Sequence, residues 1–194
     1  MAISLILLPG ITQAQDVVGS AIVDGRVITL FEDNTWEYTA PSEPDCSPIA
    51  RGVEFCGRGS GWTATTPPNA DIVAAYRYDD RHYGQMIIEE IGEEDGLTAA
   101  FMRDAVIQNA AVTTGLRPSE IPVIETYRSR VSGGSIETVV YSLNVDGLAV
   151  VFANSIRTAP RRTMQLMTYG IENEYTERHR DLHSAFLEQI RIAK

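Results

Sequence analysis

Residues 134–169 read GSIETVVYSLNVDGLAVVFANSIRTAPRRTMQLMTY, and this stretch predicts the centre of the fold. Apolar and other residues alternate from Val139 to Val145, which is the period of two expected of a strand with one buried face. Asp146-Gly147 tolerates the positive φ values of a tight hairpin turn. The segment from Leu148 is apolar on both faces, as in a central strand, and residues 163–169 predict a third strand. The stretch therefore predicts a three-stranded antiparallel meander.

Further elements extend the meander on both sides. Strands are predicted at residues 72–78, 83–91 and 123–131, where β-branched and aromatic residues lie between turn residues. Helices are predicted at residues 97–113 and 176–192, where apolar residues follow helical spacing. The sequence thus predicts an α+β fold: a mostly antiparallel sheet of about six strands covered by two helices, preceded by a small three-stranded β unit.

The composition is that of an acidic globular chain. Of its 194 residues, 44% are hydrophobic and 22% are charged, and 16 Lys+Arg against 26 Asp+Glu give a formal net charge of -10. We see no basic stripe, which argues against nucleic-acid binding because phosphate recognition needs clustered cations. An acidic surface instead favours solubility or a cationic partner.

The first residues indicate export. Ile3 to Leu8 form a short apolar core, too short to span a bilayer, and Thr12-Gln13-Ala14 supplies small residues for a signal peptidase. No basic residue precedes the core, and an N-terminal strand is the alternative interpretation. We expect periplasmic or secreted localisation, without stable membrane insertion after cleavage. The expected organisation is a signal peptide (1–14), a small β unit (15–40), a disulfide-bounded linker or loop (41–60) and an α+β sandwich domain (61–194).

The two cysteines fit an oxidising compartment. Cys46 and Cys56 lie close together in a Pro/Gly-rich segment, which favours one disulfide. Such a bridge closes a loop of about ten residues and contributes about 2–3 kcal/mol in the chain-entropy model. A metal site built on both thiols is the alternative, but no His or second Cys pair lies nearby in the sequence.

Aromatic residues supply candidate contacts with a partner. Residues 21–39 predict three short strands, and Trp36 and Tyr38 fall on one side of the last. The run DGRVITLFEDNTWEY (24–38) resembles a short motif near the N-termini of many exported bacterial proteins of unknown role. We name Trp36, Tyr38 and Trp62 as candidate partner-binding residues. Packing within the fold, or self-association, is the alternative role.

The order of elements resembles the Mog1/PsbP/DcrB-like superfamily over residues 60–192. The resemblance begins at Gly61-Trp62 and Pro67-Pro68, continues through two strands, a helix and the meander, and ends in a helix with the stripe Phe186-x-x-x-Ile190. It implies an α/β sandwich and a non-enzymatic accessory or binding role, since members include a Ran-binding factor, photosystem extrinsic subunits and bacterial envelope lipoproteins. It implies no particular functional residue and no cofactor.

Histidines are the strongest candidates for chemistry. His179 and His183 are four residues apart on the predicted terminal helix, so their rings can share a metal ion, with His82 as a third ligand. The residue after His179 is Arg180, whereas zinc proteases place a catalytic Glu there. We therefore favour histidines without a catalytic role and expect neither a catalytic residue nor a bound metal.

These observations favour an exported bacterial, non-catalytic binding or accessory protein. Its expected partner is another envelope or secreted protein. Two alternatives stay open: a small metal-dependent hydrolase that uses His179 and His183, and an acidic inhibitor of a cationic secreted enzyme. The acidic composition and the predicted disulfide motivate the second alternative.

Overall fold

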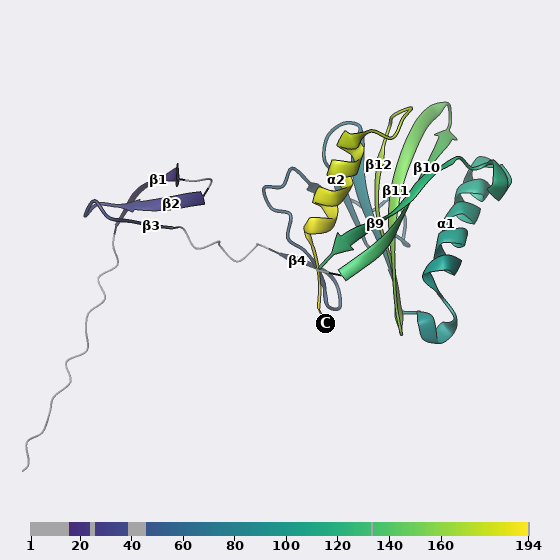
Figure 1. Ribbon diagram of the computed structural model, residues 1–194, viewed down its shortest axis with the longest axis horizontal. Helices are drawn as coiled ribbons and strands as arrows, with labels where there is room; N and C mark the ends of the chain where they lie inside the picture. Colours follow the sequence, from purple (N-terminus) through teal and green to yellow (C-terminus); the bar gives the residue numbers. More distant parts are fainter. Residues whose placement is uncertain (1–15, 24–25, 39–45, 133, 194) are drawn as a thin grey trace, which may run out of the picture. The chain divides into compact units, whose positions relative to one another are not determined.

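The computed structural model describes residues 16–23, 26–38, 46–132 and 134–193. The chain divides into two compact units, residues 1–43 and residues 44–194. Figure 1 shows the strands of each unit. The segment expected to be a signal peptide, residues 1–14, lies outside the described residues.

The smaller unit contains one antiparallel sheet in the order β1-β2-β3. Its strands are β1 (Val17–Val23), β2 (Arg26–Phe31) and β3 (Trp36–Tyr38). The turn before β3 includes Asn34 at a φ of 64°, a left-handed conformation that Asn tolerates better than most residues. This sheet is the three-stranded β unit predicted for this part of the chain.

The larger unit is built on a seven-stranded antiparallel sheet in the order β6-β7-β8-β12-β11-β10-β9. The strands are β6 (Thr63–Thr65), β7 (Ala74–Arg77), β8 (His82–Glu89), β9 (Val123–Val131), β10 (Gly134–Val145), β11 (Leu148–Ala159) and β12 (Arg162–Gly170). The sequence predicted about six strands; the additional one is β6, three exposed residues that are too short to show a period of two.

The central meander forms as predicted from residues 134–169. Tyr141 of β10 pairs with Phe152 of β11, which in turn pairs with Tyr169 of β12. Asp146 and Gly147 form the first turn with φ values of 52° and 86°, the left-handed region that a tight hairpin turn requires. The register places the apolar sets of all three strands on matching faces.

Two α-helices cover opposite faces of the sheet, as Figure 1 shows for the described residues. Helix α1 (Ala99–Thr114) packs on β10 and β11, and helix α2 (Glu177–Glu188) packs on β12 and β9. The Thr98 and Thr176 side chains accept hydrogen bonds from backbone N–H groups three residues ahead and so cap the first turns. The 3₁₀ helices η1 (Glu93–Asp95) and η2 (Pro118–Glu120) flank α1.

A second, small sheet corrects two expectations. Strands β4 (Ser47–Ala50), β5 (Val53–Phe55) and β13 (Ile190–Ile192) form an antiparallel sheet in the order β13-β5-β4. The segment 41–60 was expected to be a linker or loop, but β4 and β5 lie within it. The last helix was expected to reach residue 192, but α2 ends at Glu188 because Ile190 pairs with Phe55 and buries its side chain.

Each face of the main sheet has its own apolar core. Under α2, Phe186 is fully buried against Phe55, Trp62 and Tyr76. Under α1, buried residues of the helix pack on the other face of β10 and β11. In the part of the chain that the structure describes, we find no helix with the length and apolar character needed to cross a bilayer.

Candidate functional site

A groove of about 750 Å³ lies between α1 and the part of the sheet that α1 leaves uncovered. Its base includes Ile87, Met167 and Tyr169, which are only half-buried although β8 and β12 are inner strands. The groove ("the α1 groove") is lined by Pro68, Asn69, Ile72, Gln85, Ile87, Val106, Asn109, Ala110, Thr113, Tyr141, Leu143, Val145, Asp146, Leu148, Val150, Phe152, Asn154, Gln165, Met167, Tyr169 and Ile171.

An aromatic ladder crosses four strands on the α1 side of the sheet. The rings of Tyr141 and Phe152 stack at a centroid distance of 5.0 Å, Phe152 and Tyr169 lie 5.4 Å apart, and Tyr169 stacks on Tyr83 at 5.1 Å. Cross-strand pairing positions each ring opposite the next, so the meander register produces the ladder. Three of its four rings line the α1 groove.

Polar groups in the groove are mainly uncharged amides. Asn154 donates a hydrogen bond to Gln165 Oε1 at 3.1 Å, and Gln85 donates to the Tyr169 hydroxyl at 3.3 Å. Asn154 Oδ1 is buried and lacks a partner in strict hydrogen-bond geometry within the described residues, although the Asn154 side chain interacts with the hydroxyl of Tyr141. Among the described lining residues there is no Lys or Arg, and Asp146 is the single carboxylate. This chemistry suits an uncharged, largely apolar molecule with a hydrogen-bond donor.

A second cluster surrounds His82 at the start of β8. His82 Nδ1 lies 2.8 Å from Asp79 Oδ1, and His82 Nε2 lies 2.9 Å from Glu172 Oε1. The backbone N–H groups of Arg81 and His82 donate to Asp79, and Arg178 forms an ion pair with it at 3.2 Å. Partial burial alone would raise the pKa of Asp79, but hydrogen bonds from the Arg81 backbone and from His82 hold it below its usual value.

His179 of α2 completes this cluster. It is 1% exposed, and its Nδ1 lies 3.9 Å from Glu172 Oε2. Within the described residues, Glu172 Oε2 and both ring nitrogens of His179 are buried without a partner in hydrogen-bond geometry. Burial lowers the pKa of His179; Glu172 and a backbone hydrogen bond with Thr168 oppose this shift, and His82 adds to it.

His183 belongs to a different network, one helical turn further along α2. Its Nε2 lies 2.8 Å from Ser155 Oγ, and its Nδ1 lies 2.9 Å from Thr168 Oγ1. Ser155 continues through Thr138 to Ser129 at 2.6 Å per step, so hydroxyl groups span β11, β10 and β9. Burial, with a smaller contribution from His179, lowers the pKa of His183 to about 3. Of the three histidines considered as joint metal ligands, the structure therefore places His179 near His82. Both ring nitrogens of His183 are instead in hydrogen-bond contact with hydroxyl groups.

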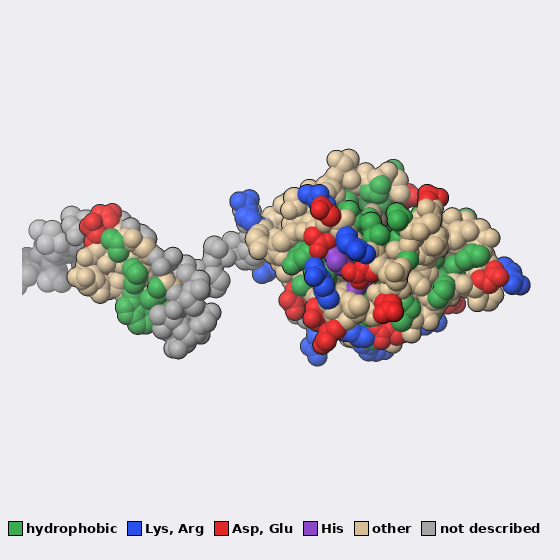
Figure 2. Space-filling view, turned by 90° about the horizontal axis from the view of Figure 1, so that it is seen from above, with side chains coloured by type: hydrophobic (Ala, Val, Ile, Leu, Met, Phe, Trp, Pro, Cys, Tyr) green, Lys and Arg blue, Asp and Glu red, His purple; other side chains and the backbone are tan. Residues whose placement is uncertain are grey.

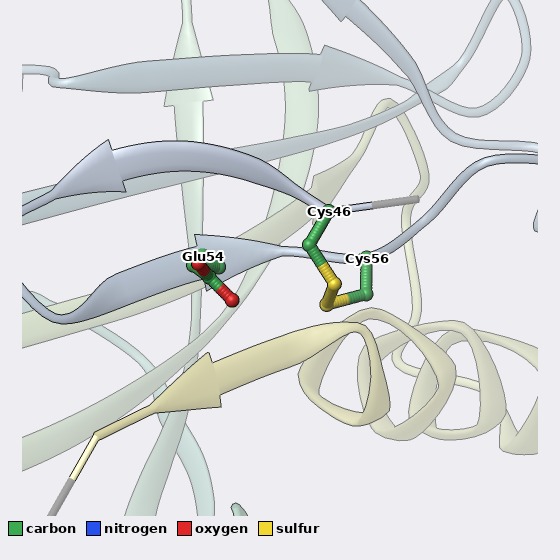
Figure 3. A group of neighbouring side chains, drawn as sticks. All are labelled: Cys46, Glu54 and Cys56. Atoms are coloured by element: carbon green, nitrogen blue, oxygen red, sulfur yellow. A yellow bond between two sulfur atoms is a disulfide. The ribbon is translucent and has the colours of Figure 1, made fainter. Parts of the chain in front are cut away.

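The predicted disulfide is present. Cys46 and Cys56 are joined by an S–S bond of 2.05 Å beside the β4–β5 pair, as Figure 3 shows. Together with Glu54, these cysteines are the one group of three metal-ligand side chains whose donor atoms lie within 4.8 Å of one another in the described part of the chain. Because the sulfurs are bonded to each other, they are not thiolate ligands. A disulfide fits an oxidising compartment.

The aromatic candidates for partner binding lie in different surroundings. Trp36, in the smaller unit, is 53% exposed. The side chain of Tyr38 lies outside the described residues. Trp62 is 6% exposed and packs 4.9 Å from the ring of Phe186, so it is a core residue and not a surface contact. For Trp62 the structure favours the alternative role, packing within the fold.

The α1 groove and the role of Glu172 were missed from the sequence. The groove lies over two inner strands that α1 does not cover, and local sequence patterns do not predict which part of a sheet a helix leaves uncovered. Glu172 lies in the connection between β12 and α2, where acidic residues are ordinary. Half-polar alternation in β8, with Tyr83, Gln85 and Ile87 on one face, was the one available signal of an incompletely covered face.

Comparisons with known proteins give similarity at the level of structure, and one of these matches supports the fold. Searches with the sequence found no matching family profile and no matching curated protein. The solution structure of cyanobacterial PsbP (CyanoP) from Synechocystis sp. PCC 6803 matches with a TM-score of 0.52 at 13% identity, covering 80% of this chain and 97% of that one. The crystal structure of LpqN, involved in cell envelope biogenesis of Mycobacterium tuberculosis, matches with a TM-score of 0.42 at 14% identity, covering 80% of this chain and 87% of that one.

The likeness to CyanoP confirms the fold predicted from the order of elements. At this level of identity it shows the fold alone, because one fold supports many functions. The N-terminal DGR…EDNTWEY motif stays a prediction.

Proposed function

We propose that this PsbP-like protein is an exported, non-catalytic accessory protein that binds an uncharged apolar or amphiphilic small molecule in the α1 groove. The observation that supports this proposal is the groove itself: inner strands of the main sheet present half-buried apolar side chains that no element of the described chain covers. Soluble proteins seldom leave such a surface open without a ligand or partner.

The dimensions and chemistry of the groove support a small ligand. A volume of about 750 Å³ falls within the range of roughly 300–1,000 Å³ typical of small-molecule sites. Aromatic rings at the base offer flat apolar contact, and the half-buried amides of Gln85 and Gln165 in the lining can hydrogen-bond to a ligand hydroxyl. An anionic head group would find no cation among the described lining residues. A neutral lipid such as a monoacylglycerol meets these conditions.

Export is supported by two separate features. The first residues have the pattern of a signal peptide, and the Cys46–Cys56 disulfide suits an oxidising compartment. A protein partner in the envelope stays a prediction from the sequence.

The test is equilibrium binding of a neutral lipid. We would measure displacement of Nile red, an uncharged fluorophore, from the full chain by monoolein, with oleate as the anionic comparator. Met167→Glu places an unpaired charge on the half-buried base of the groove and should weaken monoolein binding at least about tenfold, because burying a charge is costly. Val112→Glu adds the same charge on α1 at a position that is 72% exposed and outside the groove, so binding should be unchanged.

Two results would overturn the proposal. One is the absence of saturable monoolein binding by the unmodified protein. The other is equal binding by the Met167→Glu and Val112→Glu variants. Oleate that binds as tightly as monoolein would refute the argument from the missing cations. Thermal melts of both variants establish that each is folded before binding is compared.

A further inference from the structure

We propose that His82, Glu172 and His179 form a binding site for a divalent transition-metal ion such as Zn²⁺. The three side chains come from different elements: β8, the connection between β12 and α2, and the first turn of α2. A bound ion would therefore tie the start of α2 to the sheet. This site is separate from the α1 groove, since it shares none of the groove's lining residues.

Unpaired buried donor atoms point to an ion at this position. Glu172 lies between the two rings, with Oε1 2.9 Å from His82 Nε2 and Oε2 3.9 Å from His179 Nδ1. Buried polar side chains are normally hydrogen-bonded, yet within the described residues Glu172 Oε2 and both nitrogens of the 1% exposed His179 lack a partner in strict hydrogen-bond geometry; His179 has looser interactions with the Thr168 backbone and with Glu172 Oε2. A metal ion would satisfy two of these three atoms at once.

The spacing of the rings is close to what zinc requires. The ring centroids of His82 and His179 are 6.1 Å apart, with the rings perpendicular. Two imidazoles that bind one tetrahedral ion at Zn–N distances of about 2.1 Å have centroids about 5.3 Å apart. The rings therefore have to approach by about 0.8 Å between centroids, and at least one pair of donor atoms, now more than 4.8 Å apart, has to close to the roughly 3.4 Å of a tetrahedral site. Gly170 permits this approach: a Cβ there would stand 3.2 Å from His82, 3.4 Å from His179 and 3.5 Å from Glu172, in the space that they surround.

Asp79 has the position of an outer carboxylate in a metal site. Metal-binding histidines usually donate their second ring N–H to a carboxylate, which selects the nitrogen that faces the metal. Asp79 accepts at His82 Nδ1 and leaves Nε2 as the ligand atom. Metal binding would displace the proton from Nε2 to solvent and replace the contact between Nε2 and Glu172. Two imidazole nitrogens and one carboxylate suit Zn²⁺ better than Mg²⁺ or Ca²⁺, which prefer oxygen ligands.

An ion can reach this position from solvent. A surface pocket of about 430 Å³ opens over His82 and Glu172, and its lining also includes Asp79, Asp80, Arg81 and Arg178. This lining carries three carboxylates and two guanidinium groups beside the His82 ring. Figure 2 shows histidine surface, in purple, between acidic and basic side chains of the larger unit.

The experiment measures Zn²⁺ binding to the full chain after EDTA treatment and gel filtration. A chromophoric chelator as competitor reports affinity and stoichiometry, and Co²⁺ substitution reports the ligands through its visible spectrum. We expect one equivalent per chain. Glu172→Gln and His82→Gln should each weaken binding by about 100-fold, and Asp79→Asn by about tenfold, as typical for an outer carboxylate. Glu174→Gln is the matched control, because this exposed carboxylate lies in the same connection and outside the site.

The outcomes separate this site from its alternatives. The proposal is refuted if the unmodified chain takes up no stoichiometric Zn²⁺, or if Glu172→Gln binds as tightly as Glu174→Gln. Loss of binding in His183→Gln with full binding in His82→Gln would assign the metal to the His179–His183 pair and overturn this site. A rise in the melting temperature with Zn²⁺, absent from Glu172→Gln, would support the proposal independently of the competition assay.

Discussion

Replacing His183 should change how the stability of the protein depends on pH. His183 is fully buried, and both ring nitrogens contact hydroxyl groups at 2.8 and 2.9 Å. Burial lowers its pKa from 6.5 to about 3, so the ring is neutral in the folded protein throughout the mildly acidic range. In the unfolded chain, the same ring takes up a proton near its ordinary pKa of about 6.5.

The sign and size follow from this difference in proton uptake. Between the two pKa values the unfolded chain holds one more proton at this site, so acidification favours unfolding. The stability is fully present above the unfolded pKa and is lost as pH falls, by about 1.4 kcal/mol per pH unit. Over the whole interval between the two pKa values the loss approaches about 5 kcal/mol. His179 adds a loss of the same sign, because burial lowers its pKa as well.

The assay compares slopes, not absolute stabilities. We would follow urea unfolding by the fluorescence of the buried Trp62, with EDTA present, between about pH 5 and pH 6.5, where few carboxylates titrate. His183→Gln cannot take up a proton, so its stability should fall less steeply, by about 1 kcal/mol per pH unit averaged over this range. Ser184→Ala, at the exposed neighbouring position, should keep the original slope. Equal slopes for His183→Gln and the unmodified protein would contradict the reasoning. If the variant is too unstable to measure, NMR titration of His183 should show a neutral ring at pH 5.

Two further changes test the packing of the larger unit. Gly84→Ala should lower the free energy of unfolding by about 1–3 kcal/mol, because the added Cβ meets the buried Phe186 ring at 2.6 Å. In urea unfolding, the double variant Gly84→Ala with Phe186→Leu should lose less free energy of unfolding than the sum of the two single variants. Strictly additive losses would argue against a clash between the added Cβ and the Phe186 ring. Replacing Cys46 and Cys56 with Ser should cost about 2–3 kcal/mol, from the loop of ten residues that the disulfide closes. Adding a reductant to the unmodified protein should lower the free energy of unfolding by the same amount, which checks this prediction.

The sequence predicted the middle of the fold well, because local signals there agree with tertiary packing. Alternation in β10 and the Asp146-Gly147 turn indicate one register only, since a slip of one residue would expose the apolar set. The small sheet was missed for the opposite reason. Ile190 continues the spacing of four from Leu182 and Phe186, so the apolar pattern alone cannot distinguish a longer helix from a helix followed by a short strand. Pairing with Phe55 decides between them, and that partner is remote in sequence.

The candidate sites were harder to predict, because their residues meet only in the folded chain. His82 and Glu172 are separated by 90 positions and lie 2.9 Å apart. The spacing of His179 and His183 allowed a shared metal only as an alternative. The hydroxyl groups of Ser155 and Thr168 that contact His183 lie on strands, so the helical pattern could not predict them. The α1 groove reflects the length and position of α1 over the sheet, which depend on packing and not on a motif.

The pairing of β13 with β5 sets the order in which the protein can be completed during synthesis. Strand β5 begins at Val53, whereas its neighbour β13 is Ile190–Ile192, far later in the chain. While the chain is being made, β5 has one neighbour, β4, and its other edge remains open until residue 192 has left the ribosome. An open edge can pair with other chains. The Cys46–Cys56 bridge joins the ends of the β4–β5 hairpin. If this disulfide forms early, it keeps β4 and β5 paired, so that β13 can add to the open edge of β5.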